Sequence, residues 1–446
     1  MRVYRTRATK RDAPPEIQAA EGTARCTAGE GKTDGHPALG GIGVRRIRRF
    51  SSTRMELIGW GNCRKPSKFA SRTFSAKMFV TSLISQEESM PLLNSYGIWN
   101  NKGGVGKSTI TFHLASRYAA QHPDQKVLVI DLCPQSNVSM MLLGGGTKGE
   151  QNVLNFCTAA TPTTVVGYLS QVIANGAGAP LPNPFDYIVS VETYNASLPK
   201  NLFLLCGDGN LEPMAPAISG AAAAPALTPT VQPWKWVHSV FTDLISNIAA
   251  VDEAANWMVF IDTNPSFSIY TELAVSASLR LVVPVNADDS SRVATNAMFV
   301  LLHGQTPPHP IYGSWTFAAQ AMKYGIIIPE IHVVVGNRLT QYEGAASAFK
   351  ALSDATADTL FSAYKTHPGY FVKRNATSRN VEEFRHAYSV ALRDFNTAGV
   401  VAAHLGRPLA KMEQGYYKVH GNDVKVNADR VKECLEALDE LVARID

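Results

Sequence analysis

Runs of aliphatic residues recur along the chain, and several end in a polar or charged residue. The clearest two are 127–130 and 257–261, which are followed directly by Asp131 and Asp262. Neither run alternates apolar with polar positions, so both are predicted to be strands of a parallel sheet with both faces buried. Further strands are predicted at 96–100, 201–208, 279–285 and 331–338. In the third of these, Pro284 indicates either the end of the strand or an irregular bend.

Helical periodicity appears between these runs and again at the end of the chain. After the first predicted strand, apolar residues follow at Ile110, Leu114, Tyr118 and Ala119. The last pattern runs through Val431, Leu435, Leu438, Leu441, Val442 and Ile445. This terminal helix carries more acidic than basic residues, which would repel an anionic lipid surface, so it is predicted to pack on the core. The order of elements predicts an α/β fold: a mostly parallel twisted sheet of seven or eight strands with helices on both faces.

Two segments are predicted to lie outside this framework. Residues 212–232 are rich in Ala and Pro and are expected to form a surface loop, because proline removes hydrogen bonds from helices and strands alike. Residues 1–89 lack hydrophobic periodicity and are expected to be disordered. The remaining 90–446 should form a single domain. Residues 1–77 contain 17 Lys and Arg against 6 Asp and Glu, so the extension is basic although the whole chain has a net charge of only +5.

Three interpretations of the basic extension remain open. Clustered arginines neutralise phosphates, which favours a nucleic-acid-binding arm. Arg-rich and acid-poor starts are also typical of transit peptides. The third interpretation gives the extension no function, since Met78 and Met90 both precede the first strand and a start codon assigned too far upstream would produce such a tail.

Composition excludes several classes of protein. With 45% hydrophobic and 18% charged residues, the chain has the make-up of a globular protein. No apolar run reaches the roughly 18 residues that a membrane-spanning helix requires, so no membrane role is expected. The six cysteines form no C-x-x-C pair, which argues against a zinc site or a disulfide framework. The cytoplasm is the expected compartment.

The strongest chemical signal lies between the first strand and the first helix. Glycines there allow successive backbone N–H groups to curl around a phosphate, while the following helix presents its positive end to the same anion. Lys107 would reach the β- and γ-phosphates of a nucleotide, and the Ser108 hydroxyl would bind Mg²⁺. The predicted cofactor-binding residues are Asn101, Lys102, Gly103, Gly104, Val105, Gly106, Lys107, Ser108 and Thr109.

The run K-G-G-V-G-K-S-T, residues 102–109, resembles the deviant Walker A motif of the ParA/MinD superfamily, and most closely that of ParA-type partition ATPases. Asn101 stands where the ordinary motif has its first glycine. The resemblance implies that Lys102 crosses a dimer interface to the phosphates of the partner's nucleotide. Lys102, Lys107 and Asp131 are therefore the expected catalytic residues.

The segment D-L-C-P-Q-S-N, residues 131–137, resembles the D-x-D-P-Q-G-N segment of the same superfamily. By this resemblance Asp131 helps to hold Mg²⁺ through water. Cys133 replaces the second aspartate, which orients the attacking water, and a neutral thiol is a poor hydrogen-bond acceptor or base. ATP hydrolysis is therefore expected to be slow, although positioning and charge neutralisation carry most of the catalysis of phosphoryl transfer.

Two further strand ends complete the predicted site. D-T-N-P-S, residues 262–266, resembles the Walker B stretch D-T-P-P-S, with Asn264 in place of the first proline. Asp262 would join Ser108 and Asp131 as a ligand of the Mg²⁺ water shell. The resemblance also implies that Asn337, at the end of the last strand, contacts adenine, although an asparagine at this position could equally cap a turn.

The resemblance implies a Mg-ATP-dependent homodimer that binds DNA non-specifically and is reset by a ParB-like or other protein regulator. Local basic residues are candidates for DNA contact or for an ordinary solvated surface: Lys373, Arg374, Arg379 and Arg385. The alternative is a nucleotide-gated positioning or assembly factor, similar to MinD, that binds no DNA. An iron-sulfur relative would need paired cysteines, and no convincing pair is visible.

Overall fold

An eight-stranded sheet lies at the centre of the computed structural model, which describes residues 94–226, 230–337, 346–392, 395 and 397–446. The predicted disordered extension, 1–89, lies outside the described residues. The strands follow the order β3-β4-β2-β5-β1-β6-β7-β8, and only β3 is antiparallel to its neighbour. The strands are β1 (Asn94–Ile98), β2 (Lys126–Leu132), β3 (Val189–Ser190), β4 (Leu202–Leu205), β5 (Trp257–Thr263), β6 (Arg280–Asn286), β7 (Glu330–Asn337) and β8 (Ser389–Ala391).

The central strands are apolar on both faces, as the uninterrupted aliphatic runs predict. In β2, Val127 and Val129 face one layer of the core, whereas Leu128 and Ile130 face the other. Successive residues of a strand point to opposite faces, so this division follows from the pleat. Parallel strands joined by helical crossovers are covered on both sides, and the α/β fold class is confirmed.

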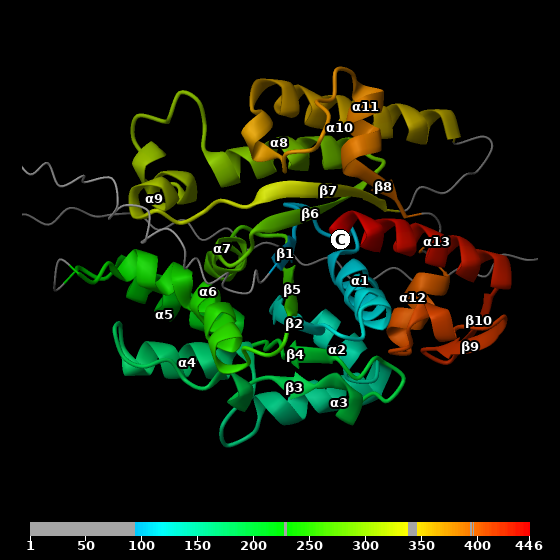
Figure 1. Ribbon diagram of the computed structural model, residues 1–446, viewed down its shortest axis with the longest axis horizontal. Helices are drawn as coiled ribbons and strands as arrows, with labels where there is room; N and C mark the ends of the chain where they lie inside the picture. The colour runs from blue at the N-terminus through cyan, green and yellow to red at the C-terminus, as the bar shows by residue number, and fades with distance from the viewer. Residues whose placement is uncertain (1–93, 227–229, 338–345, 393–394, 396) are drawn as a thin grey trace, which may run out of the picture. The chain divides into compact units, whose positions relative to one another are not determined.

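Helices form a layer on each side of the sheet (Figure 1). One layer contains α1 (Lys107–Gln121), α2 (Asn137–Leu142), α3 (Gly146–Cys157), α12 (Ala398–His404) and α13 (Ala428–Ile445), with the hairpin of β9 (Gly415–Val419) and β10 (Asn422–Val426) at its edge. The other layer contains α4 (Val165–Asn175), α5 (Leu211–Ala223), α6 (Pro233–Val251) and α7 (Ile269–Ser276) against β2 and β5. It continues with α8 (Asp289–His303), α9 (Phe317–Tyr324), α10 (Ala346–Thr366) and α11 (Val381–Tyr388) against β6 and β7.

The terminal helix packs on the core, as its pattern predicts. Its apolar stripe is buried at Val431, Cys434, Ala437, Leu438, Leu441, Val442 and Ile445. Side chains from two other elements fix it further, because the Tyr96 hydroxyl donates a hydrogen bond to the Ile445 carbonyl at 3.0 Å and Arg117 pairs with Asp439 at 2.5 Å. In the part of the chain that the structure describes, no helix is long and apolar enough to span a membrane.

The prediction of a surface loop over 212–232 is wrong for its first half, because α5 extends from Leu211 to Ala223. Alanine has the highest helix propensity of all residues. Pro213 lies in the first turn, where its missing N–H has no partner to lose. Pro216 lies on the exposed face, opposite the buried side chains of Leu211 and Ile218. Composition therefore misled the prediction, while the apolar spacing at 211, 218 and 222 is helical.

Pro284 lies inside β6 rather than at its end. It pairs with Val335 of β7 on one side, and β1 ends at Ile98 before it reaches Pro284 on the other. Pro284 has no N–H to donate toward β1, but no residue of β1 lies opposite it to accept a hydrogen bond. The Asn100 side chain instead donates a hydrogen bond to the Pro284 carbonyl at 2.7 Å. The irregularity in this strand lies earlier, between Leu281 and Val282.

Candidate functional site

The glycine-rich segment 101–106 connects the carboxyl end of β1 to α1. Because β1 lies between β5 and β6, this segment stands beside the ends of the central strands. In a doubly wound sheet, ligands bind at the carboxyl ends of the strands, near the point where the strand order reverses. The fold thus brings three of the sequence-predicted groups to one place: the glycine loop, Asp131 and Asp262.

The backbone of this loop depends on glycine at two positions. Gly104 and Gly106 have φ of 71° and 86°, a left-handed conformation that other residues adopt only at a cost. Gly106 is the N-cap of α1 and provides no side chain to satisfy the first N–H groups of the helix. Those N–H groups are a ready anion-binding feature. At Gly103 and Gly104 an added Cβ would meet nothing within 4 Å, so this side of the loop faces open space.

Asn337 holds the loop from behind. Its Nδ2 donates a hydrogen bond to the Val105 carbonyl at 2.9 Å, and its side chain lies so close to Gly106 that a Cβ there would collide with it. Asn337 is only 6% exposed. The structure therefore places Asn337, the residue predicted to contact adenine, beside the glycine loop, where its side-chain amide already donates to the loop backbone.

Lys107 lies beneath the loop. Its Nζ donates to the Lys102 carbonyl at 2.9 Å and to the Asn100 carbonyl at 3.4 Å. Burial lowers the pKa of Lys107 to about 8, although the carboxylate of Asp262 opposes the shift. Among the residues that the structure describes, the ammonium group donates hydrogen bonds to these two backbone carbonyls, and it stands where a lysine of this motif is suited to bind phosphate oxygens.

Asp131 and Asp262 are paired across β2 and β5, and both are fully buried. Burial raises the pKa of Asp131, and the neighbouring Asp262 adds to this effect. Burial also raises the pKa of Asp262, although hydrogen bonds from Ser108 and Thr111 oppose it. The Ser108 hydroxyl donates to Asp262 at 2.6 Å and that of Thr111 at 3.1 Å. A divalent cation would relieve the repulsion between two buried carboxylates, so this donor set fits Mg²⁺.

Asp131 differs from Asp262 in its hydrogen bonds. It accepts from the backbone N–H of Cys133 and of Ser139, both at 3.1 Å, and from the Ser139 hydroxyl at 2.7 Å. The Ser139 hydroxyl in turn accepts from the N–H of Gly207 at 2.9 Å. Asp131 therefore organises the loop after β2, whereas Asp262 faces α1.

Cys133 is buried, and burial together with Asp131 and Asp262 raises the pKa of its thiol to about 12. It is therefore a neutral thiol at physiological pH. Three residues on, Ser136 occupies the glycine position of the resembled motif and adopts a left-handed φ of 51°. Its hydroxyl is buried and has no hydrogen-bond partner among the described residues. Both departures from the motif lie in the loop that Asp131 organises.

Asn264 begins a polar chain that reaches the other helical layer. Its Nδ2 donates to the Tyr270 hydroxyl at 3.1 Å, and Tyr270 donates to Glu212 at 2.7 Å. The proline of the resembled Walker B stretch could not donate such a bond. The neighbouring Thr263 donates to the Ile98 carbonyl at 2.7 Å and so links β5 to the end of β1.

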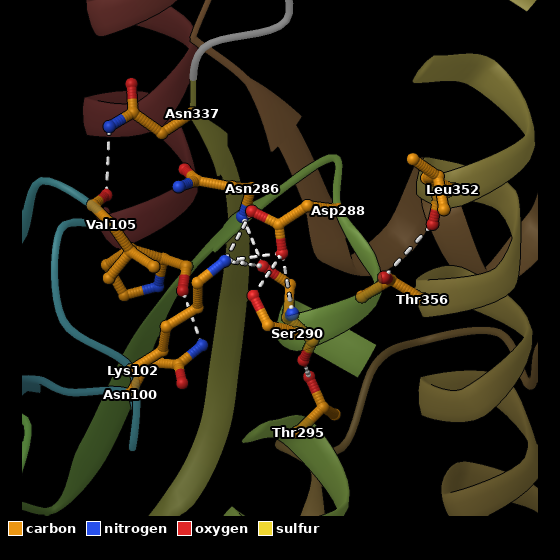
Figure 2. A network of polar contacts seen from close by, with 12 residues as sticks. Asn100, Lys102, Val105, Asn286, Asp288, Ser290, Thr295, Asn337, Leu352 and Thr356 are labelled. Carbon is orange, nitrogen blue, oxygen red and sulfur yellow. Dashed lines mark hydrogen bonds and ion pairs between the residues drawn. The ribbon is translucent and has the colours of Figure 1, made fainter. Parts of the chain in front are cut away.

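Lys102 donates hydrogen bonds to two residues of the same chain, Asp288 and Ser291 at the start of α8 (Figure 2). These two partners and Thr111 are site residues that the sequence prediction missed. Asp288 follows the end of β6, so the rule that polar residues at parallel strand ends gather at one edge could have found it. Ser291 stands three residues after Asp288, the spacing of an N-cap interaction.

The basic residues proposed for DNA contact are partly engaged elsewhere. Arg374 donates to the His332 carbonyl at 2.7 Å and stacks on Tyr388, while Arg385 pairs with Asp354 at 2.5 Å. Of the four residues, only Lys373 and Arg379 are exposed. The structure therefore offers no continuous basic face from this cluster.

The oxygen donors at the site are of the kind that Mg²⁺ binds. Among the residues that the structure describes, no group of three or more His, Cys, Asp or Glu side chains could hold a metal ion. Mg²⁺ commonly binds through one or two carboxylates and completes its shell with water and phosphate oxygens. Ser108 and Asp262, with Asp131 beside them, match that pattern.

Comparison with known proteins agrees with this geometry. The family described as the CobQ/CobB/MinD/ParA nucleotide binding domain matches residues 96–442. No curated protein matches the sequence.

Several solved structures are partly similar to this chain. Apo McdA from Cyanothece is 15% identical, with 78% of this chain and 98% of that chain covered and a TM-score of 0.45. A complex of a Cyanothece McdA variant with ATP is also 15% identical, covering 78% and 96%, with a TM-score of 0.46. A plasmid partition protein from Borrelia burgdorferi is 14% identical, covering 79% and 99%, with a TM-score of 0.40.

Proposed function

Because the chain belongs to the CobQ/CobB/MinD/ParA family of nucleotide-binding proteins, we propose that it is a Mg-ATP-dependent ATPase that works by pairing two subunits. The observation that carries this proposal is the convergence of three features at one edge of the sheet. These are the left-handed glycine loop, the buried ammonium of Lys107, and the carboxylate of Asp262 bonded to Ser108.

In the proposed complex, the N–H groups of residues 101–109 surround the phosphates, and Lys107 binds the β- and γ-phosphate oxygens. Asn337 contacts adenine. Ser108 and Asp262 hold Mg²⁺, directly or through water, and Asp131 supports the water shell. When bound, the cation supplies neutralisation of the phosphate charge that grows during transfer.

The proposed hydrolysis is slow. The neutral thiol of Cys133 cannot accept a proton from the attacking water, so positioning and charge must supply most of the rate. Lys102 is the expected contact with the nucleotide of the partner subunit. The ATP-bound dimer would then bind a ParB-like or other protein regulator.

Non-specific DNA is a further proposed ligand of the dimer. The alternative is a positioning or assembly factor that does not bind DNA. The engagement of Arg374 and Arg385 in contacts of their own chain favours the alternative. Retention of the protein on DNA at low salt, only with Mg-ATP, would support DNA binding, because phosphate contacts weaken steeply as salt rises. No retention at low salt, with ATP-dependent pairing intact, would support the positioning factor.

Isothermal titration calorimetry with Mg-ATP tests the core of the proposal. We expect the unmodified protein to bind and Lys107→Ala to lose measurable affinity. Lys432→Ala, which removes an exposed lysine of α13, should bind as the unmodified protein does. Folded protein with no magnesium-dependent affinity for adenine nucleotides would refute the proposal.

A further inference from the structure

The ammonium group of Lys102 is fully engaged within its own subunit. Its Nζ donates to both carboxylate oxygens of Asp288, and to the Ser291 hydroxyl at 3.1 Å. A lysine has three donors, so these acceptors use its whole capacity. The side chain of Lys102 is only 17% exposed, whereas that of Asp288 is 43% exposed. Figure 2 shows the contact joining the loop after β1 to the first turn of α8.

Asp288 is organised to receive this ammonium group. As the N-cap of α8 it accepts from the N–H of Ser291 at 2.8 Å, and it accepts from the Ser290 hydroxyl at 2.9 Å. Although partial burial opposes ionisation, the hydrogen bonds from Lys102, Ser290 and Ser291 lower the pKa of Asp288 to about 2. The Ser291 hydroxyl also accepts from the N–H of Asn286 at 3.1 Å. The acceptor is thus fixed and charged throughout the physiological range.

This arrangement conflicts with the role of Lys102 in the proposed function. A group whose three donors are used cannot bind the phosphates of another subunit without leaving Asp288 or sharing it. We propose that Asp288 holds Lys102 in the unpaired subunit, and that pairing exchanges this carboxylate for the partner's triphosphate. Asp288 is then a positioning residue that sets the threshold for pairing. This inference rests on the proposed function.

The exposure of the pair sets the size of the effect. Partly exposed ion pairs are weak compared with buried ones. A triphosphate carries more negative charge than one carboxylate, so the exchange can proceed. Asp288 should therefore shift the protein concentration needed for pairing by about tenfold rather than forbid pairing.

Asp288→Asn removes the negative charge but keeps the N-cap of α8, because asparagine is as good an N-cap as aspartate. We expect the concentration for half-maximal pairing in Mg-ATP, measured by analytical ultracentrifugation, to fall about tenfold. Asp289→Asn is the matched control: it removes the same charge one residue along, from an exposed side chain in the same helical turn. An equal shift in both variants would overturn the inference, since it would show a general effect of charge.

A second comparison tests whether the effect passes through Lys102. In a Lys102→Ala background, Asp288→Asn should cause no further change in pairing. A tenfold gain that persists there would overturn the inference. If the unmodified protein and Asp288→Asn both bind Mg-ATP but neither pairs, the inference is also overturned. If neither binds Mg-ATP, the proposed function itself fails.

A third measurement needs no nucleotide. The reactivity of Lys102 toward an amine-acylating reagent, followed by mass spectrometry, reports directly on its engagement. Asp288→Asn should raise that reactivity severalfold, and Asp289→Asn should not. Unchanged reactivity in the Asp288 variant would overturn the inference even if pairing changed.

Discussion

Asp131 and Asp262 lie opposite each other at the carboxyl ends of β2 and β5, and neither side chain is exposed. Two carboxylates so placed cannot both ionise without cost, and burial increases that cost. The pKa of each is raised from 3.8 toward neutrality. The fold therefore carries a pH-dependent electrostatic cost at the place where the proposed cation would bind.

We expect Asp262→Asn to become more stable relative to the unmodified protein as the pH rises from about 4 to about 7. A carboxyl group with a raised folded-state pKa stabilises the fold fully below pH 3.8, and this stabilisation is lost as the pH passes the folded pKa. The difference in the free energy of unfolding should change by about 2 kcal/mol over this range. Urea denaturation without magnesium measures it.

The free energy of unfolding must be compared between the variant and the unmodified protein at each pH. In both proteins the buried histidines make this free energy rise with pH, which opposes the effect of Asp262. Burial lowers the pKa of His113, His303 and His332 to about 4, so their contribution improves as the pH rises. Asp423→Asn, on the exposed hairpin, is a control that should show no such divergence. A pH-independent difference for Asp262→Asn would show that the pKa of Asp262 is not raised in the folded protein.

We expect Cys133→Asp to raise the steady-state rate of ATP hydrolysis by about tenfold or more. A carboxylate can orient the attacking water and accept its proton, and general-base catalysis contributes about 10²–10⁴-fold. The third carboxylate should also lower stability, since Cys133 lies close to Asp131 and Asp262. Phosphate release is the measurement.

Cys133→Ser is the matched control for this variant, because it is polar but cannot act as a base at neutral pH. Its hydrolysis rate should stay near that of the unmodified protein. Equal rates for the Asp and Ser variants would mean that residue 133 does not take part in the chemistry.

We expect Gly106→Ala to destabilise the protein by about 2 kcal/mol or more, while Gly103→Ala changes stability by less than about 0.5 kcal/mol. A Cβ at 106 would occupy a left-handed residue and collide with Asn337. A Cβ at 103 would meet nothing within 4 Å. Thermal unfolding of the nucleotide-free proteins checks this, and equal stability of the two variants would contradict the loop geometry described above.

Features encoded by local pattern could be predicted from the sequence. The strands that contain Asp131 and Asp262 are predictable because an uninterrupted aliphatic run identifies a parallel strand, although each strand extends one residue past its carboxylate, to Leu132 and Thr263. Composition does not predict helix α5, because its helical signal lies in the spacing of the buried positions Leu211 and Ile218. The place of Pro284 inside β6 depends on β1 ending before it, which the local sequence does not specify.

The contact between Lys102 and Asp288 could not be predicted in this way. The two residues are 186 positions apart, and they meet because β1 and β6 are neighbours in the sheet. No local periodicity specifies that order of strands. The family resemblance implies that Lys102 is directed at another subunit, whereas the fold supplies an acceptor within the same one.

The hydrogen bond from Asn337 to the Val105 carbonyl means that the curve of the glycine loop at Val105 is fixed when the sheet assembles. The proposed phosphate ligand would therefore meet a backbone whose curvature there is set by folding. Little conformational entropy remains to be lost on recognition, which favours ligands that match the existing curvature over those that would require the backbone to adapt.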